Sequence, residues 1–98
     1  MTITKKQNGS TLELAVAGRL DTMTAPELEA ALSKDMGAAE ELILDFSKLD
    51  YISSAGLRVL LSAHKAMLPK EGMKVIHVND IVQEVFEVTG FADILTIE

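Results

Sequence analysis

Residues 45–61 read DFSKLDYISSAGLRVLL. The aliphatic run just before them, Leu42-Ile43-Leu44, shows no alternation, which is typical of a strand covered on both faces. Residues 41–46 are therefore predicted to form the central strand of a sheet, and a loop over residues 47–53 is expected to follow. Partners and ligands of open α/β sheets meet the ends of the strands, so a functional site is expected within this stretch.

A helix is predicted after the two serines of this stretch, because apolar residues then recur at helical spacing until Pro69 stops the pattern. Its apolar stripe comprises Leu57, Leu60, Leu61, His64 and Leu68. Further along, a strand is expected over residues 73–78 and a last short strand over residues 94–97. Asp80 and Gln83 are spaced as a capping pair for the helix between these strands, and Gly90 is expected to end it.

Upstream of the stretch, Thr24 and Glu27 have the spacing of a capping box, and Pro26 fits a first helical turn. A helix is therefore predicted from about Ala25 to Asp35, with Gly37 closing it.

The chain opens with Asn8-Gly9 between two alternating stretches, residues 1–6 and 11–17, which predicts a tight antiparallel hairpin. The whole order, β-β-α-β-α-β-α-β, predicts the α/β class. We expect a mixed, mostly parallel β-sheet with an N-terminal β-hairpin and helices packed against it. Ninety-eight residues suit one domain, residues 1–98.

The composition and net charge disfavour several classes of partner and chemistry. The net charge of −6 disfavours nucleic acid as a partner, because binding to phosphates depends on Lys and Arg. There is no cysteine, which excludes disulfides and thiolate chemistry and fits a reducing compartment. The first residues lack a signal pattern, and no apolar run approaches the roughly 18 residues that cross a bilayer. We therefore expect a cytoplasmic protein without membrane insertion.

Ser53 and Ser54 are predicted to lie at a helix N-terminus, where free backbone N–H groups and the helix dipole favour an anion. A phosphate on Ser54 would suit this position, and Gly56 either keeps the approach to Ser54 open or permits close packing. Serine is also a favoured N-cap, so the residues alone leave capping and regulation both open.

The pattern D-F-S-x-L-x-x-I-S-S-A-G-L over residues 45–57 resembles the signature of STAS domains, named for sulfate transporters and anti-sigma factor antagonists. Gly18-Arg19-Leu20-Asp21 resembles the family's Gly-x-Leu-Asp step after the second strand, and the closing helix before Gly90-Phe91 resembles its C-terminal half. The resemblance covers essentially the whole chain. It implies the STAS fold and an anti-sigma factor antagonist.

In the antagonists the motif usually reads Asp-Ser-Ser/Thr-Gly-Leu, and the first serine is phosphorylated. Carried over, that serine is Ser54. This chain has Ser53 where the family has Asp, and Ala55 where it has Ser or Thr. Ser53 is therefore a second candidate acceptor.

The resemblance implies partner switching, in which the unmodified domain binds an anti-sigma factor serine kinase and a sigma factor is released. Phosphorylation at Ser54 switches the binding off, and a serine phosphatase restores it. No catalysis, cofactor or metal is expected, and the protein is expected to be a monomer or weak dimer. The expected partner-binding residues are Asp21, Thr22, Ser53, Ser54, Ala55, Gly56, Leu57 and Arg58.

Two alternatives stand beside this interpretation. One is a STAS-type binding subunit of a transporter or scaffold complex that phosphorylation does not regulate. The other is an enzyme or nucleotide-binding module, for which the chain has neither a phosphate-binding Gly-rich loop nor a catalytic triad. Asp21, Asp45 and Asp50 are interpreted as turn residues rather than a magnesium or acid–base site, and His64 and His77 as packing residues.

Overall fold

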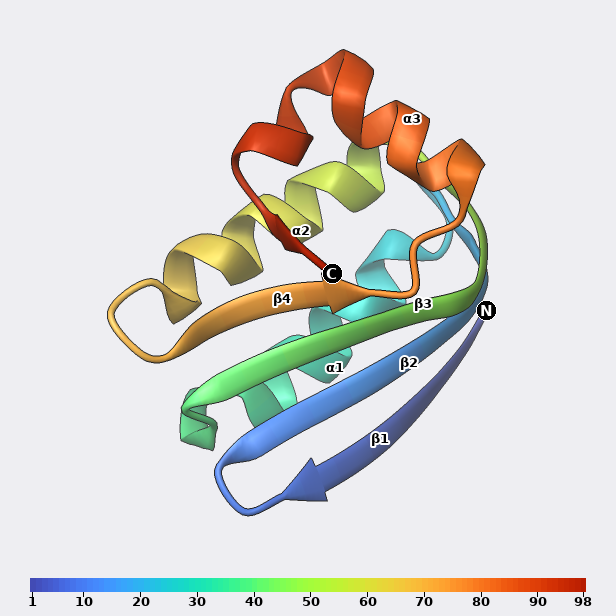
Figure 1. Cartoon of the computed structure of the whole chain (residues 1–98). Coiled ribbons are helices and arrows are strands. Elements are labelled where there is room, and N and C mark those ends of the chain that lie inside the picture. The colour runs from blue at the N-terminus through green and yellow to red at the C-terminus, as the bar shows by residue number, and fades with distance from the viewer.

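The computed structural model describes residues 1–98, and its elements follow the order expected from the sequence (Figure 1). The strands are β1 (Thr2–Asn8), β2 (Thr11–Leu20), β3 (Glu41–Ile52), β4 (Gly72–Ile76) and β5 (Thr96–Ile97). The helices are α1 (Ala25–Asp35), α2 (Ser54–Met67) and α3 (Asp80–Thr89), with short 3-10 helices η1 (Met36–Ala38) and η2 (Phe91–Asp93).

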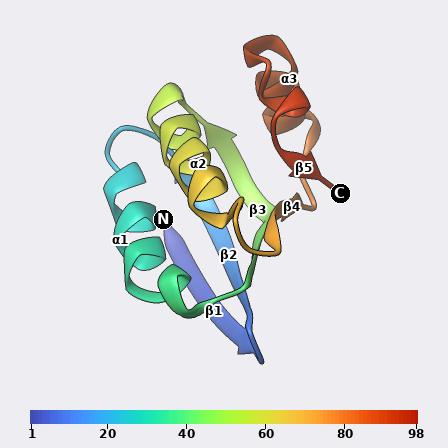
Figure 2. The same cartoon turned by 90° about the vertical axis from the view of Figure 1, so that its left-hand side faces the viewer.

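The sheet has the order β1-β2-β3-β4-β5, in which β1 pairs with β2 antiparallel and every later pair is parallel. The α/β class, the opening hairpin and the central place of β3 are therefore confirmed. Each crossover moves to the next strand in the same direction along the sheet. Because parallel crossovers are right-handed, they bring the helices to one face of the sheet, where Figures 1 and 2 show α1 and α2.

The prediction that β3 is covered on both faces was wrong. Its first half alternates, with Leu42, Leu44 and Phe46 buried on the helical face and Ile43 half-buried on the other. A two-sided sheet needs strand order to reverse, so that later crossovers reach the second face. Here the order never reverses, and the second face carries no α-helix.

The loop predicted over residues 47–53 was wrong except at Ser53, because β3 continues to Ile52 and pairs with the second half of β2. The pairing register shifts twice, and each shift places an extra residue in β3, as in a β-bulge. The inward positions are consequently Phe46, Leu49 and Ile52, three residues apart instead of two. This spacing hides the strand from a search for alternation.

The helix α1 spans the predicted residues, but its start is not a capping box. The Thr24 side chain makes no cap hydrogen bond, since its hydroxyl donates to Arg19 O at 2.7 Å and accepts from Asp21 N at 2.9 Å. The Asp21 carboxylate instead accepts from the N–H groups of Met23 and Thr24. Asp21 and Thr24 thus bind each other across a turn that leads into the helix.

Other local signals differ in part from expectation. The hairpin loop is Gly9-Ser10, since Asn8 still pairs with Thr11. The N-cap of α3 is Asn79, whose side chain accepts from Val82 N at 2.8 Å, so the pair starting at Asp80 was one residue late. Gly90 has φ +83 at the end of α3, which confirms the expected glycine there.

The α1 terminus also departs from expectation. Gly37 lies inside η1 and is not among the glycines with positive φ, so α1 ends without a left-handed glycine.

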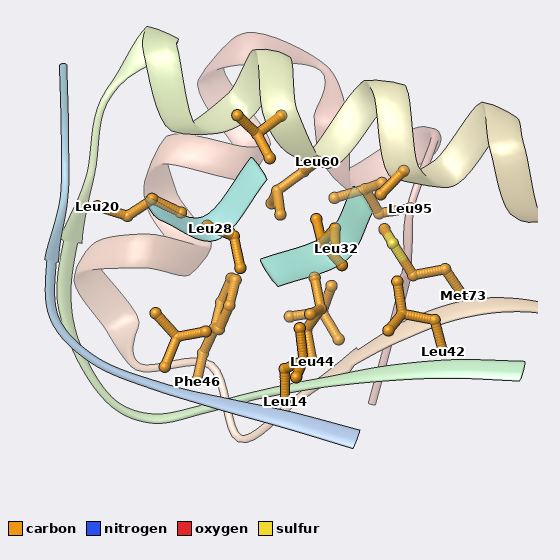
Figure 3. Close-up of a cluster of buried hydrophobic side chains, with 14 of the residues drawn as sticks. Leu14, Leu20, Leu28, Leu32, Leu42, Leu44, Phe46, Leu60, Met73 and Leu95 are labelled. Atoms are coloured by element: carbon orange, nitrogen blue, oxygen red, sulfur yellow. The ribbon is translucent and has the colours of Figure 1, made fainter. Parts of the chain in front are cut away.

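The core lies between the sheet and the helices, and Figure 3 shows leucines of β2, β3, α1 and α2 meeting there. No polar or charged side chain is buried in it. The buried stripe of α2 differs from the expected one, because Leu61 and His64 are half-buried and Leu68 is exposed. The buried residues of α2 are Gly56, Leu57, Val59, Leu60, Ala63 and Met67. No helix is both long and apolar enough to span a membrane.

Candidate functional site

The start of α2 presents Ser54 to solvent. Ser53 is the N-cap residue, with extended backbone at φ −104 and ψ 178, and Ser54 is the first residue of the helix. No side chain caps this end, and no protein acceptor is bound by the N–H groups of Ser54, Ala55 or Gly56. The exposed hydroxyl of Ser54 therefore lies beside uncapped donors and the positive end of the helix dipole.

Ser53 is held by its backbone and not by its hydroxyl. Its N–H donates to Leu20 O at 2.9 Å, and its carbonyl accepts from Leu57 N at 3.0 Å. Its Oγ is buried and has no hydrogen-bond partner. The two serines thus differ in accessibility, since Ser54 is exposed and the Ser53 hydroxyl is not.

Gly56 permits close packing of α2 on the sheet. A Cβ at this position would lie 2.7 Å from Leu20 Cγ and 2.8 Å from Ile52 Cγ1, closer than real side chains approach. Of the two interpretations of Gly56, the structure supports close packing and not access to Ser54. The residue is buried in the domain, and its partner-binding role stays a prediction.

The turn after β2 is fixed by Asp21. Burial acts to raise the pKa of this carboxyl, but hydrogen bonds from Thr24 and Met23 and the charge of Arg19 outweigh it and hold the pKa below its ordinary value of 3.8. Arg19 Nε lies 3.7 Å from Asp21 Oδ2, and its guanidinium stacks 4.6 Å from the Tyr51 ring centre. Asp21 therefore shapes the turn, as interpreted from the sequence.

The expected partner-binding residues divide into a surface group and a packing group. Thr22, Ala55 and Arg58 line one depression between α1 and α2, and Ser54 and Arg58 share a second one with residues near the end of α3. Leu57 is only 5% exposed and serves mainly the core. The accessible part of the site therefore comprises the exposed Thr22, Ser54 and Arg58 and the half-buried Ala55.

Asn79 supports the site from α3, and the sequence analysis did not single it out. Its Nδ2 donates to Leu49 O at 2.7 Å, while its Oδ1 caps α3. It thereby ties α3 to the bulged half of β3 that leads to Ser53 and Ser54. The available signal was its residue type, because Asn is among the preferred N-caps and precedes the helix that was expected at Asp80.

Asp45 was interpreted as a turn residue, but it lies within β3, at the first bulge. It accepts from Ser47 N at 2.9 Å, and His77 Nδ1 lies 3.1 Å from its Oδ1. Burial acts to raise the pKa of Asp45, but the hydrogen bonds from Ser47 and His77 outweigh it and hold the pKa below 3.8. His77 is exposed and has φ +59, and His64 is half-buried on α2. No His, Asp and Glu side chains gather in a group of three that could hold a metal ion.

The chain belongs to the STAS domain family, because the family described as "Mlab, STAS domain" matches residues 3–96. It is 35% identical over 99 residues to BtrV of Bordetella bronchiseptica, covering 99% of this chain and 85% of BtrV. It is 29% identical over 96 residues to the anti-sigma-B factor antagonist of Listeria monocytogenes, covering 96% of this chain and 84% of that protein.

Solved structures share the fold at lower identity. An anti-sigma factor antagonist from Mycobacterium paratuberculosis superposes with a TM-score of 0.89 at 22% identity, covering 98% of this chain and 83% of that one. The phosphorylated form of SpoIIAA from Bacillus superposes with a TM-score of 0.75 at 18% identity, covering 99% of this chain and 91% of that one. A sulfate transporter family protein from Wolinella succinogenes superposes with a TM-score of 0.76 at 16% identity, covering 90% of this chain and 73% of that one. This likeness confirms the STAS fold.

Proposed function

We propose that the protein is an anti-sigma factor antagonist that binds an anti-sigma factor serine kinase and so releases a sigma factor in the cytoplasm. Two similarities support this. The Listeria relative is named an anti-sigma-B factor antagonist, and BtrV is proposed as an anti-sigma factor antagonist. The observation that carries the proposal in this chain is the exposed Ser54 at the uncapped start of α2.

Phosphorylation of Ser54 switches the binding off. The Ser54 hydroxyl oxygen forms a bond to the γ-phosphorus of ATP, the bond between that phosphorus and ADP breaks, and the hydroxyl proton passes to a base of the kinase. The product carries about −1.5 to −2 charge and three acceptor oxygens, which the N-terminus of α2 accommodates within the domain. At a kinase interface the same charge must be desolvated, which opposes binding. A serine phosphatase then restores the unmodified protein.

Burial favours Ser54 over Ser53 as the acceptor. A kinase must reach the oxygen that attacks ATP, and the Ser53 Oγ is buried while Ser54 is exposed. Phosphorylation of Ser53 would require the start of α2 to separate from the end of β2, where Ser53 N binds Leu20 O.

The test uses the kinase that co-purifies with the tagged protein. Wild type, Ser53→Ala and Ser54→Ala are each incubated with this kinase and ATP, and the sites are mapped by mass spectrometry. We expect phosphate on Ser54 in the wild type and in Ser53→Ala, and none in Ser54→Ala. Ser54→Ala should keep its affinity for the kinase, whereas Ser54→Asp should weaken it. Phosphate on Ser53, or equal affinity of the two Ser54 variants, would contradict the proposal.

The likeness to the Wolinella sulfate transporter protein supports one second candidate, a STAS-type binding subunit of a transporter or scaffold complex that phosphorylation does not regulate. The same purification distinguishes the two. A serine kinase among the captured proteins supports the antagonist, and a transporter ATPase or a multi-protein assembly supports the second candidate.

A further inference from the structure

A groove beside Ser54 runs between the first turns of α2 and the end of α3. Figure 2 shows α3 beside α2. In Figure 1, η2 is the short red turn that follows α3 and lies above α2 in that view. The groove has a volume of about 360 Å³. Its lining residues are Ser54, Leu57, Arg58, Leu61, Thr89 and Phe91.

The floor and the rim of this groove differ in chemistry. Leu57, Leu61 and Phe91 give it an apolar floor, while Ser54 and Arg58 lie on the α2 side and Thr89 on the α3 side. A cavity of about 150 Å³ already holds a benzene ring, so the groove has room for one aromatic or branched aliphatic side chain. A concave apolar surface next to the proposed acceptor serine fits a contact with the kinase.

Arg58 is a cation without a partner in the domain. It is exposed and forms no ion pair, although Glu29 lines the neighbouring depression with it. A carboxylate brought by a partner would complement the guanidinium, which binds carboxylates in a bidentate fashion. The groove and Arg58 together therefore fit a partner segment with an apolar side chain next to an acidic one.

Arg58 also lies four residues after Ser54 on α2. Residues at this spacing are neighbours on one helix face, with Cβ atoms about 5 to 6 Å apart. A phosphate on Ser54 is therefore within reach of the Arg58 guanidinium, and guanidinium binds phosphate in the same forked geometry that it uses for carboxylates.

We infer that the groove receives an apolar side chain of the kinase while Arg58 pairs with an adjoining carboxylate, and that phosphate on Ser54 captures Arg58 and so removes this contact. The inference rests on the proposed function and names the surface through which it operates. Phosphorylation then acts twice, because it adds a charge at the rim and occupies the cation that the partner needs.

The phosphate half of the inference is tested without any kinase. Phosphoserine is incorporated at position 54 during synthesis, and the phosphate is titrated by phosphorus-31 NMR in the wild type, in Arg58→Gln and in Lys65→Gln. Lys65→Gln is the control, because it removes an exposed cation from the last turn of the same helix. The phosphate pKa, ordinarily near 6, should be higher in Arg58→Gln than in the wild type by about 0.3 to 1 unit, and unchanged in Lys65→Gln. Equal values in all three proteins would overturn the capture of the phosphate by Arg58.

The groove is tested by calorimetry with the co-purified kinase. Leu61→Ala truncates a groove residue, and Leu68→Ala truncates an exposed leucine at the far end of α2. We expect Leu61→Ala and Arg58→Gln each to weaken binding about tenfold, as truncation of a central contact does, and Leu68→Ala to leave it unchanged. Wild-type binding with no difference between the two leucine variants would overturn the groove while the proposed function stands. No binding by the wild type would overturn the function and the groove's occupant together.

Discussion

Gly56 acts through the side chain that it lacks, since α2 approaches Leu20 and Ile52 too closely for a Cβ. Gly56→Ala should lower the free energy of unfolding by about 1 to 2 kcal/mol. Overpacking costs about 1 to 3 kcal/mol, and the better helix propensity of alanine offsets up to about 1 of it. Urea unfolding measures the change.

Gly37→Ala is the matched control for this prediction, because nothing lies within 4 Å of a Cβ built at Gly37. It should leave the stability unchanged or raise it by a few tenths of a kcal/mol, since alanine restricts the unfolded chain. Equal losses in both variants would mean that the close packing of Gly56 does not determine its effect.

Asp45 is expected to make the free energy of unfolding depend on pH in the acidic range. Its pKa in the folded protein lies below 3.8, so the unfolded chain binds more protons than the folded one in that range, and stability rises with pH. The contribution is complete above the unfolded pKa and disappears as the pH falls through the folded pKa. The stability difference between the wild type and Asp45→Asn should therefore shrink between about pH 5 and pH 2. Urea unfolding across this range measures it.

The control for the acid prediction is Asp50→Asn, which changes an exposed carboxylate of the same strand that makes no hydrogen bond in the structure. Near neutral pH, Asp50→Asn should cost less stability than Asp45→Asn, because it removes no hydrogen bond. A constant difference for Asp45→Asn across the range would count against the hydrogen bonds from Ser47 and His77 as the source of the effect.

At the scale of elements, α2 and α3 begin differently although each has a polar N-cap residue. Asn79 caps α3 and also binds Leu49 O, whereas the Ser53 hydroxyl of α2 caps nothing. Asn79→Ala should cost about 2 kcal/mol, from the lost cap and an unpaired carbonyl. Ser53→Ala should be neutral or slightly stabilising, because it removes a buried hydroxyl without a partner. Thermal and urea unfolding of both variants provide the comparison.

Asn79→Asp separates the two roles of the asparagine. Aspartate keeps the acceptor for Val82 N and loses the donor to Leu49 O. We expect about half the loss of Asn79→Ala. If Ser53→Ala instead cost about 1 kcal/mol, the Ser53 hydroxyl would be acting as an N-cap in solution.

The elements could be predicted where one local signal determines them. Alternation in the hairpin, an aliphatic run in β3 and helical spacing predicted the order of the elements, Pro26 and helical spacing predicted the start of α1, and Gly90 predicted the end of α3. The second half of β3 could not be found this way, because its two bulges move the inward positions to Phe46, Leu49 and Ile52. The predicted cap at Thr24 failed because its hydroxyl binds the Arg19 carbonyl, and Ser53 caps nothing because its hydroxyl is buried without a partner. The residue spacing encodes neither arrangement.

At the scale of the molecule, the strand order determines which face of the sheet carries the helices and therefore where the groove forms. The order never reverses, so the α-helices share one face, and α2 and α3 form a groove there beside the proposed acceptor. The position of Ser54 at the start of a helix followed from the sequence. The groove did not, because Phe91 is far from Leu57 and Leu61 along the chain. Its surface exists only once β4 and α3 have brought the chain back.

The central claim is that phosphate on Ser54 ends kinase binding while the fold survives. Its most direct test compares two preparations of the protein, one with serine and one with phosphoserine at position 54. For each, the dissociation constant for the co-purified kinase and the midpoint of thermal unfolding are measured. We expect the phosphorylated protein to bind at least tenfold more weakly, a change of about 1.4 kcal/mol, with a midpoint equal to or above that of the unmodified protein. Equal dissociation constants, or weaker binding that comes with a lower midpoint, would contradict the account.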